Sequence, residues 1–237
     1  MSKSADEKAW LSKAQDVKSL ARAAQGWGLA LSPGLLDRLA AYAELVAGYE
    51  RANLTAERTP GAVFLKHVAD GAAAAACLKR EFLSFSAPAL LDLGAGAGFL
   101  GIPLKILWPE SRVTLCEPSK RRFDFLNRAV LSLGLGGTRL IQEAARPRAR
   151  PSEAAYDAVL AKAVLPLPKL LPLALPLLRP GGLFAAFQSS PPDPAAPSLR
   201  EALDKSGARL VKSWPYRRPL EDRDRAIALF GRREPTL

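Results

Sequence analysis

The first 80 residues carry apolar side chains at the spacing of amphipathic helices. One apolar stripe consists of Leu11, Val17, Leu20 and Ala24. This helix should end near Gly26, and proline at a first helical position predicts further helices from Pro33 and from Pro60. We therefore expect residues 1–80 to form an N-terminal helical extension packed on the rest of the chain.

From about residue 88 the pattern changes to short apolar runs that alternate with helices. The expected strands are residues 90–93, 112–116, 138–142, 156–161, 183–188, 209–214 and 226–230. The expected helices among them are residues 101–108, 120–133, 168–178 and 197–205. Such alternation predicts a Rossmann-like α/β domain over residues 81–237, with a seven-stranded, mostly parallel sheet. Residues 215–225 leave no room for a helix, so the last two strands should form an antiparallel hairpin.

The chemistry is concentrated in residues 90–109, which read LLDLGAGAGFLGIPLKILWP. Glycines at 94, 96 and 98 let the backbone turn sharply and let a ligand lie against it. In an open α/β sheet such a turn borders the crevice at the carboxyl ends of the strands.

Two ligand classes compete for this turn. The spacing of Gly96, Gly98 and Gly101 fits the dinucleotide fingerprint, but that register would bury Asp92 in the middle of a strand. The register Asp-x-Gly-x-Gly-x-Gly, from Asp92, instead resembles the first motif of class I S-adenosylmethionine (SAM) methyltransferases. An acidic residue beside the turn suits SAM, which carries a sulfonium and an ammonium group.

Glu117 ends the next expected strand, where a carboxylate can accept from both ribose hydroxyls of either ligand. The alternative is a solvent-exposed glutamate that opens a turn with Pro118. Arg121, Arg122 and Arg128 lie on the following helix, either as its solvated face or as contacts to phosphate.

Composition narrows the classes of function. Hydrophobic residues make up 49% of the 237 residues, which is ordinary for a globular protein. Two cysteines are too few for a disulfide framework or a cysteine-based zinc site, and the chain has one histidine. We expect no metal site. The net charge of +11 favours a polyanionic partner, RNA or DNA first, although a merely basic solvated surface fits as well. We see no targeting segment and no span that qualifies for a membrane, so we expect a soluble, cytoplasmic protein.

Residues 49–232 resemble the RsmG/GidB family of 16S ribosomal RNA (rRNA) methyltransferases. The similar elements are Asn53-Leu54-Thr55, Lys66-His67 with Asp70, the glycine-rich segment from Asp92, Lys120-Arg121 with Phe125-Leu126, Tyr156-Asp157 through Lys162-Ala163, and residues 219–230. The resemblance implies a class I methyltransferase fold. It also implies methylation of guanine N7 in small-subunit rRNA, with SAM as cofactor and 16S rRNA or the small ribosomal subunit as partner.

The resemblance also implies site residues. Matching positions give SAM contacts at Gly94, Phe99, Ala145, Arg146 and Lys162, to which the class I motif adds Asp92, Gly96, Gly98 and Glu117. Candidate contacts to the RNA backbone are Arg121, Arg122, Arg128, Arg217 and Arg218. Guanine N7 is already a lone pair, so no catalytic base is expected, and the rate should come from alignment. We expect the protein to act as a monomer.

Several positions depart from the family pattern. Ala95 stands where Ser or Thr is usual, Leu100 replaces a proline, Arg146 replaces an acid, and Lys162 replaces an arginine. These departures leave two alternatives open: an inactive, methyltransferase-like RNA-binding module, or a methyltransferase with another acceptor. His67 has two interpretations, a residue that shapes the substrate pocket or a capped core histidine.

Overall fold

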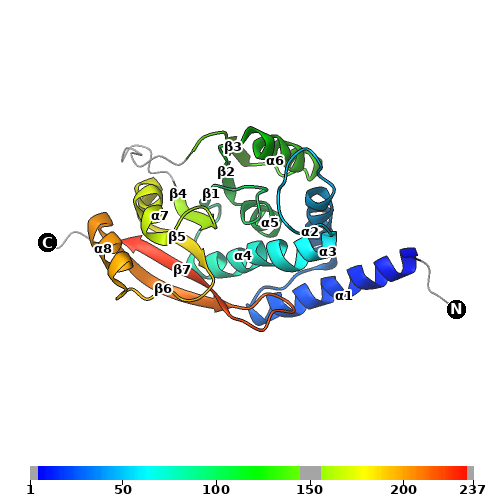
Figure 1. Cartoon of the computed structure of the whole chain (residues 1–237), viewed down its shortest axis with the longest axis horizontal. Helices are drawn as coiled ribbons and strands as arrows, with labels where there is room; N and C mark the ends of the chain where they lie inside the picture. Colours follow the sequence, from blue (N-terminus) through cyan, green and yellow to red (C-terminus); the bar gives the residue numbers. More distant parts are fainter. Residues whose placement is uncertain (1–4, 145–155, 234–237) are drawn as a thin grey trace.

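The computed structural model describes residues 5–144 and 156–233, with side chains from residue 13 onward. Seven strands form one sheet in the order β3-β2-β1-β4-β5-β7-β6 (Figure 1). The strands are β1 (Ala89–Leu93), β2 (Arg112–Cys116), β3 (Thr138–Ile141), β4 (Tyr156–Lys162), β5 (Leu178–Gln188), β6 (Ala208–Tyr216) and β7 (Arg225–Arg232). This sheet confirms the expected fold class.

Helices precede the sheet and connect its strands. They are α1 (Ala5–Gly26), α2 (Pro33–Ala47), α3 (Pro60–Val63), the π-helix η1 (Phe64–Val68), α4 (Ala69–Glu81), α5 (Gly101–Leu107), α6 (Lys120–Ser132), α7 (Leu167–Ala174), the 3₁₀-helix η3 (Leu175–Leu177) and α8 (Pro197–Ser206). The predicted starts of α2 and α3 are confirmed. Proline occupies the first turn of each, and the hydroxyls of Ser32 and Thr59 accept hydrogen bonds from the first-turn amides of Leu35 and Ala62.

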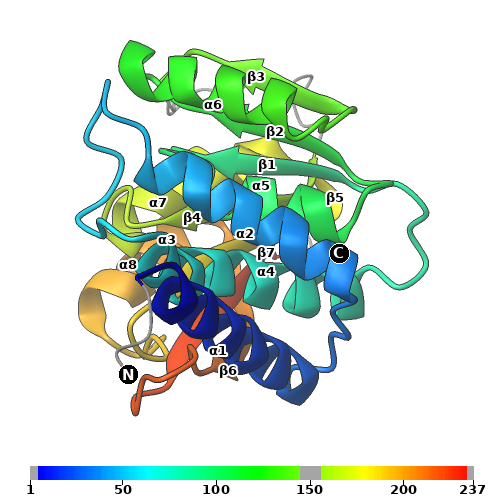
Figure 2. The same cartoon turned by 90° about the vertical axis from the view of Figure 1, so that its right-hand side faces the viewer.

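Two apolar cores flank the sheet. Buried side chains of α1, α2, α4, α5 and α6 share one core with one face, and those of α7 and α8 share a second core with the other face. Figure 2 shows α1, α2, α4 and α5 gathered on the same side of the sheet. The N-terminal helices therefore share their apolar core with one face of the sheet. The division into two domains near residue 80 stays a prediction.

The strand pairing creates a switch point. Strands β1 to β5 pair in parallel, and β7 pairs antiparallel with both β5 and β6, which confirms the expected hairpin. The chain runs outward from β1 to β2 and β3 and then returns to β4 on the other side of β1. In open α/β sheets ligands bind at such a reversal, outside the carboxyl ends of the strands.

One strand differs from its predicted bounds. β5 begins at Leu178, five residues before the predicted start at 183. The intervening Arg179-Pro180-Gly181-Gly182 reads locally as a turn, but its backbone pairs beside β4 across an irregularity in register between Tyr156 and Ala158. A β-bulge of this kind absorbs glycine and proline that would otherwise end a strand.

The helical run from Pro60 to Glu81 corrects a prediction. By length and composition it is apolar enough to cross a membrane, although no span was expected to qualify. However, 78% of its most apolar window is buried inside the protein. Its alanines therefore serve as a contact surface for the neighbouring helices.

Candidate active site

The candidate site lies at the carboxyl ends of β1, β2 and β4. The glycine-rich turn follows β1, Glu117 follows β2, and Lys162 is the last residue of β4. In the register of the sheet, Asp92 pairs with Leu115 on one side and with Leu160 on the other. Parallel pairing thus brings three segments from distant parts of the chain to one edge.

The glycine-rich turn has one closed and one open side. Gly94 has a φ of +71°, and a Cβ there would lie 2.6 Å from a methyl group of Val164, so this position packs against the segment after β4. Gly96 has a φ of +61°, and a Cβ there would meet no heavy atom within 4 Å. The space beside Gly96 is therefore open to a ligand.

Asp92 is turned toward the protein. Its carboxylate is only 3% exposed and accepts a hydrogen bond of 2.8 Å from the backbone amide of Gly101, at the start of α5. Burial raises the pKa of Asp92 to about 6, although the amides of Gly101 and Leu100 act to lower it. The observed contact joins β1 to α5, and a contact from Asp92 to a cofactor stays a prediction.

Glu117 links two segments of the edge. Its Oε2 accepts from the amide of Gly96 at 2.8 Å, and its Oε1 accepts from the amide of Ser119 at 2.9 Å. It is 3% exposed, so the alternative of a solvent-exposed turn residue is wrong. A carboxylate has about four lone-pair positions, so two remain after these contacts. Glu117 can therefore still accept from a pair of hydroxyls beside Gly96.

A second polar group lies on the β4 side of the turn. The ring of His67 stacks on Phe99 with centroids 4.0 Å apart and an interplanar angle of 18°. The ammonium nitrogen of Lys162 lies 3.1 Å from Nδ1 of His67 and 5.3 Å from the centroid of the Phe99 ring. Two residues predicted at the cofactor, Phe99 and Lys162, are thus brought together by the histidine.

Asp70, on α4, holds the ammonium group of Lys162 in place. It is fully buried and accepts from Arg218 Nε and Nη2 at 2.7 and 2.6 Å and from the hydroxyl of Tyr216 at 2.8 Å. Lys162 forms an ion pair with the same carboxylate at 2.5 Å. Burial acts to raise the pKa of Asp70, but Arg218 and Lys162 outweigh it and lower that pKa. The carboxylate is held ionised between two cations.

This geometry corrects one predicted RNA contact. Arg218 is 5% exposed, and its guanidinium is held by Asp70 and by Glu221. A buried, paired guanidinium cannot reach a phosphate, so its prediction as an RNA contact was wrong. Arg217 is exposed but pairs with Asp224 at 2.8 Å.

The other predicted site residues lie on α6, outside the described residues, or inside the glycine-rich turn. Arg121, Arg122 and Arg128 are exposed on α6, where an anionic partner can reach them. Ala145 and Arg146 lie outside the described residues. Gly98 has a φ of +79°, and a Cβ there would strike Ile102, so it shapes the turn from within.

The sequence pattern gave no sign of the polar network that joins Glu57, through His67 and Lys162, to Asp70 and Arg218. Asp70 was recognised only as part of a motif, and Glu57 was not singled out. The separation in the chain explains this, because Asp70 and Arg218 are 148 residues apart. An arginine inside the charged stretch RRPLEDRDR resembles a solvated loop residue until the fold is known.

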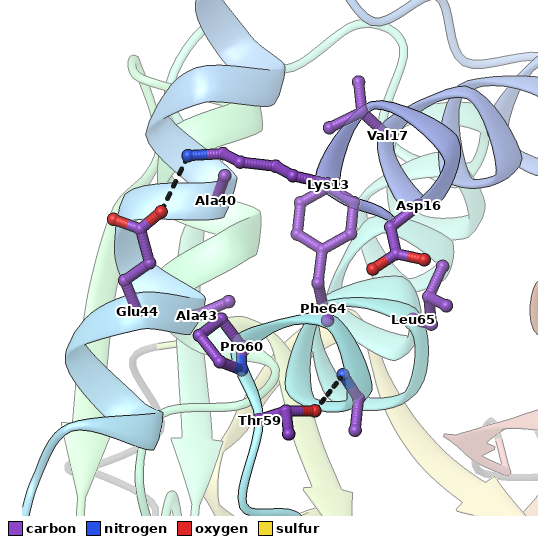
Figure 3. A pocket seen from close by; sticks show the side chains of 12 residues that line it. Lys13, Asp16, Val17, Ala40, Ala43, Glu44, Thr59, Pro60, Phe64 and Leu65 are labelled. Atoms are coloured by element: carbon purple, nitrogen blue, oxygen red, sulfur yellow. Dashed lines mark hydrogen bonds and ion pairs between the residues drawn. The ribbon is translucent and has the colours of Figure 1, made fainter. Parts of the chain in front are cut away.

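A cavity of about 580 Å³ lies elsewhere, among α1, α2 and the start of the helix at 60 (Figure 3). Lys13 and Glu44 form an ion pair of 2.7 Å between α1 and α2 at this cavity, and Phe64 and Leu65 contribute apolar side chains. None of the residues of the glycine-rich turn lines it. This cavity is therefore distinct from the site at the edge of the sheet.

Comparisons with known proteins agree with the geometry. Residues 36–212 match the family profile described as rRNA small subunit methyltransferase G. A ribosomal RNA small subunit methyltransferase G from Rubrobacter xylanophilus is 41% identical over 94% of this chain and 88% of its own. The protein of that name from Halalkalibacterium halodurans is 36% identical over 88% and 87%.

The fold is also found among solved structures. A Burkholderia thailandensis 1,6-didemethyltoxoflavin-N1-methyltransferase, solved with S-adenosylhomocysteine, superposes with a TM-score of 0.51. It is 20% identical, and the match covers 68% of this chain and 77% of that one. At this identity the likeness concerns the fold alone.

Proposed function

This chain belongs to the rRNA small subunit methyltransferase G family, and from that premise we propose that it methylates N7 of a guanosine in 16S rRNA. The protein is a SAM-dependent methyltransferase. The rRNA acceptor rests on family membership, and the observation that supports a cofactor site is the open space beside Gly96, next to the buried Glu117 carboxylate.

The residues at this edge fit SAM. We assign Glu117 to the ribose hydroxyls, because its remaining lone pairs border the open side of Gly96. Lys162 offers a cation, which suits the carboxylate of the methionine part, and Phe99 offers an apolar ring nearby. Gly94 and Gly98 shape the turn, and Asp92 fixes its position relative to α5. These assignments follow the predicted cofactor set.

The reaction needs alignment more than acid or base chemistry. When bound, SAM supplies an electrophilic methyl group on its sulfonium. The acceptor, guanine N7, already carries a lone pair, so the residues at this edge would have to hold SAM, through Glu117 and Lys162, with its methyl group in line with that atom. No proton leaves N7, so no side chain has to accept one. The task of the chain is to orient the two reactants, which is worth several orders of magnitude in rate.

The proposed RNA surface includes α6. Its exposed arginines are Arg121 and Arg122, in the first turn of the helix that follows Glu117, and Arg128 farther along the same helix. With a net charge of +11, such a surface favours an RNA backbone. N7 is reached in unpaired or extruded bases, which makes a loop of 16S rRNA or a subunit intermediate the proposed substrate. The cytoplasm, where ribosomal subunits assemble, is the proposed location.

Cofactor binding tests the site. Glu117→Gln should weaken the SAM affinity by about tenfold to a hundredfold, because a charge-assisted pair of hydrogen bonds is lost. Glu81→Gln is the matched control, since Glu81 pairs with Lys212 away from the glycine-rich turn. Equal affinities of the two variants, measured by calorimetry, would remove Glu117 from the cofactor site.

The salt dependence of the affinity for RNA tests the proposed RNA surface. Replacing the three α6 arginines by alanine should reduce the slope of log affinity against log salt concentration by about 2 to 3. An affinity for 16S rRNA that ignores salt would contradict the proposal. RNA binding without any SAM binding would instead favour a docking module.

A further inference from the structure

A π-turn interrupts the helix that carries His67. Residues 60–81 form one continuous helical run, but Phe64–Val68 within it is a π-helix. Such turns are rare and occur frequently at functional sites, because the widened turn re-aims side chains. This one carries Lys66 and His67. Both side chains contact Glu57, Lys66 through Oε1 and His67 through Oε2 at 2.8 Å.

The hydrogen bonds of His67 assign its tautomer. Its Nδ1 lies 3.1 Å from the ammonium of Lys162, which can only donate, so Nδ1 must be an unprotonated acceptor. The proton therefore sits on Nε2, which lies 2.8 Å from both Glu57 Oε2 and Thr55 Oγ1. A neutral imidazole of this tautomer donates from Nε2 to Glu57 Oε2 and accepts at Nδ1 from Lys162. The side chain is 10% exposed, so water has little access to it.

Lys162 keeps one donor for a ligand. Its ammonium has three N–H groups, of which one faces Asp70 at 2.5 Å and one faces His67. Among residues 13–144 and 156–233, no third hydrogen-bond partner of this ammonium is found. Its side chain is 18% exposed, more than His67 or Asp70 behind it. Lys162 and Phe99 are thus the outer groups of the cluster, and His67 and Asp70 support them.

We propose that His67 is a positioning residue for methyl transfer: held by Thr55 and Glu57, it fixes the Lys162 ammonium and the Phe99 ring where they hold the methionine part of the cofactor. The inference rests on the proposed function. It gives the N-terminal helices a role in the reaction, because they present His67 to the end of β4. His67 itself exchanges no proton.

Charges around His67 support a neutral ring. Glu57 faces it from the loop before α3, Lys66 from its own turn, Asp70 from α4 and Lys162 from β4, with Arg218 behind Asp70. Burial and Lys162 lower the pKa of His67 to about 4, although Glu57 and Asp70 act to raise it. The ring therefore stays uncharged across the neutral range.

The single histidine of the chain makes a direct test possible. In protein labelled with ¹⁵N-histidine, the full chain should show one imidazole with its proton on Nε2 and no titration between pH 6 and 8. In Glu57→Gln the Nε2 signal should shift, because its acceptor loses charge. A proton on Nδ1, or titration near the ordinary pKa of 6.5, would overturn the proposal. This measurement needs no methyl transfer.

Kinetics separate positioning from folding. His67→Phe keeps a ring against Phe99 but removes the acceptor for Lys162, and Glu57→Gln leaves the shape unchanged. Both should lower kcat by about tenfold or more at saturating SAM and RNA, because a misplacement near 1 Å costs up to about a hundredfold. The control Glu81→Gln should keep its rate.

The outcomes are distinct. An unchanged kcat in both variants would overturn the role of His67, as would a loss that only follows the folded fraction measured by circular dichroism. If the wild type methylates no RNA, the proposed function fails instead, and the histidine spectrum still decides whether the network exists.

Discussion

Asp70 offers the sharpest test of how the site is held together. It is the meeting point of α4, β4 and the β6–β7 connection, through Lys162, Arg218 and Tyr216. Replacing it with asparagine keeps the size of the side chain but removes the charge. Lys162 would then lose its carboxylate, and buried Arg218 would keep only Glu221 as an anionic partner.

The loss of unfolding free energy expected for Asp70→Asn follows from the burial of Asp70 and Arg218. Asp70 is 0% exposed, and the side chain of Arg218 is 4% exposed, so solvent cannot compensate for the lost charge. Breaking a buried ion pair by removal of one partner costs about 3–5 kcal/mol. For a chain of this size that corresponds to a fall in Tm of about 6–20 °C.

The assay is urea unfolding followed by circular dichroism, with Asp224→Asn as the matched control. Arg217 and Asp224 form a comparable 2.8 Å ion pair, but both side chains are more than half exposed. That control should lose at most about 1 kcal/mol. If Asp70→Asn lost no more than Asp224→Asn, the buried network would not stabilise the fold as argued.

Three further predictions concern stability and binding. Leu220 is 77% exposed with a φ of +62°, so Leu220→Gly should add up to about 1 kcal/mol to the unfolding free energy, and a lower Tm would contradict this. Gly96→Ala should cost only about 1 kcal/mol in stability, because the φ of +61° strains an alanine but the added Cβ meets no protein atom. The same Cβ would enter the open space beside the turn, so SAM binding measured by calorimetry should weaken at least about tenfold. Between pH 7 and 5, buried Asp92, whose pKa is raised to about 6, takes up a proton in the folded chain and so adds stability. His67 acts in the opposite direction: the unfolded chain binds its proton near pH 6.5 and the folded chain only near 4, so the His67 contribution to stability should fall by about 2 kcal/mol. His67→Phe should remove that part of the pH slope in urea unfolding, and an undiminished slope would assign it to other groups.

Local patterns sufficed for most of the fold. The strand at residues 112–116 was predicted with its observed bounds, because its apolar run is bordered by clear turn residues. The helix starts at Pro33 and Pro60 were likewise visible in a few neighbouring residues. The start of β5 was missed because Pro180 and the two glycines after it have the composition of a turn, and only pairing with β4 shows otherwise.

The site was predictable only as far as its motifs are local. Asp92, the glycines and Glu117 occupy one strand–turn–helix unit and the end of the adjacent strand, so their spacing alone placed them at one edge. The partners of Arg218 depend on contacts across most of the chain, and no periodicity encodes them. The π-turn at His67 also leaves no mark in composition. Burial, which decides between a solvated and a structural charge, comes from the assembled fold.

Transfer of a labelled methyl group from SAM to RNA tests the central claim most directly. The substrates are small ribosomal subunits and naked 16S rRNA from a strain that lacks this modification, with Gly94→Asp as the inactive control, because its side chain would strike Val164. We expect label at guanine N7 with the wild type and none with the variant. Label at another atom, or no label from a wild type that binds SAM, would contradict it.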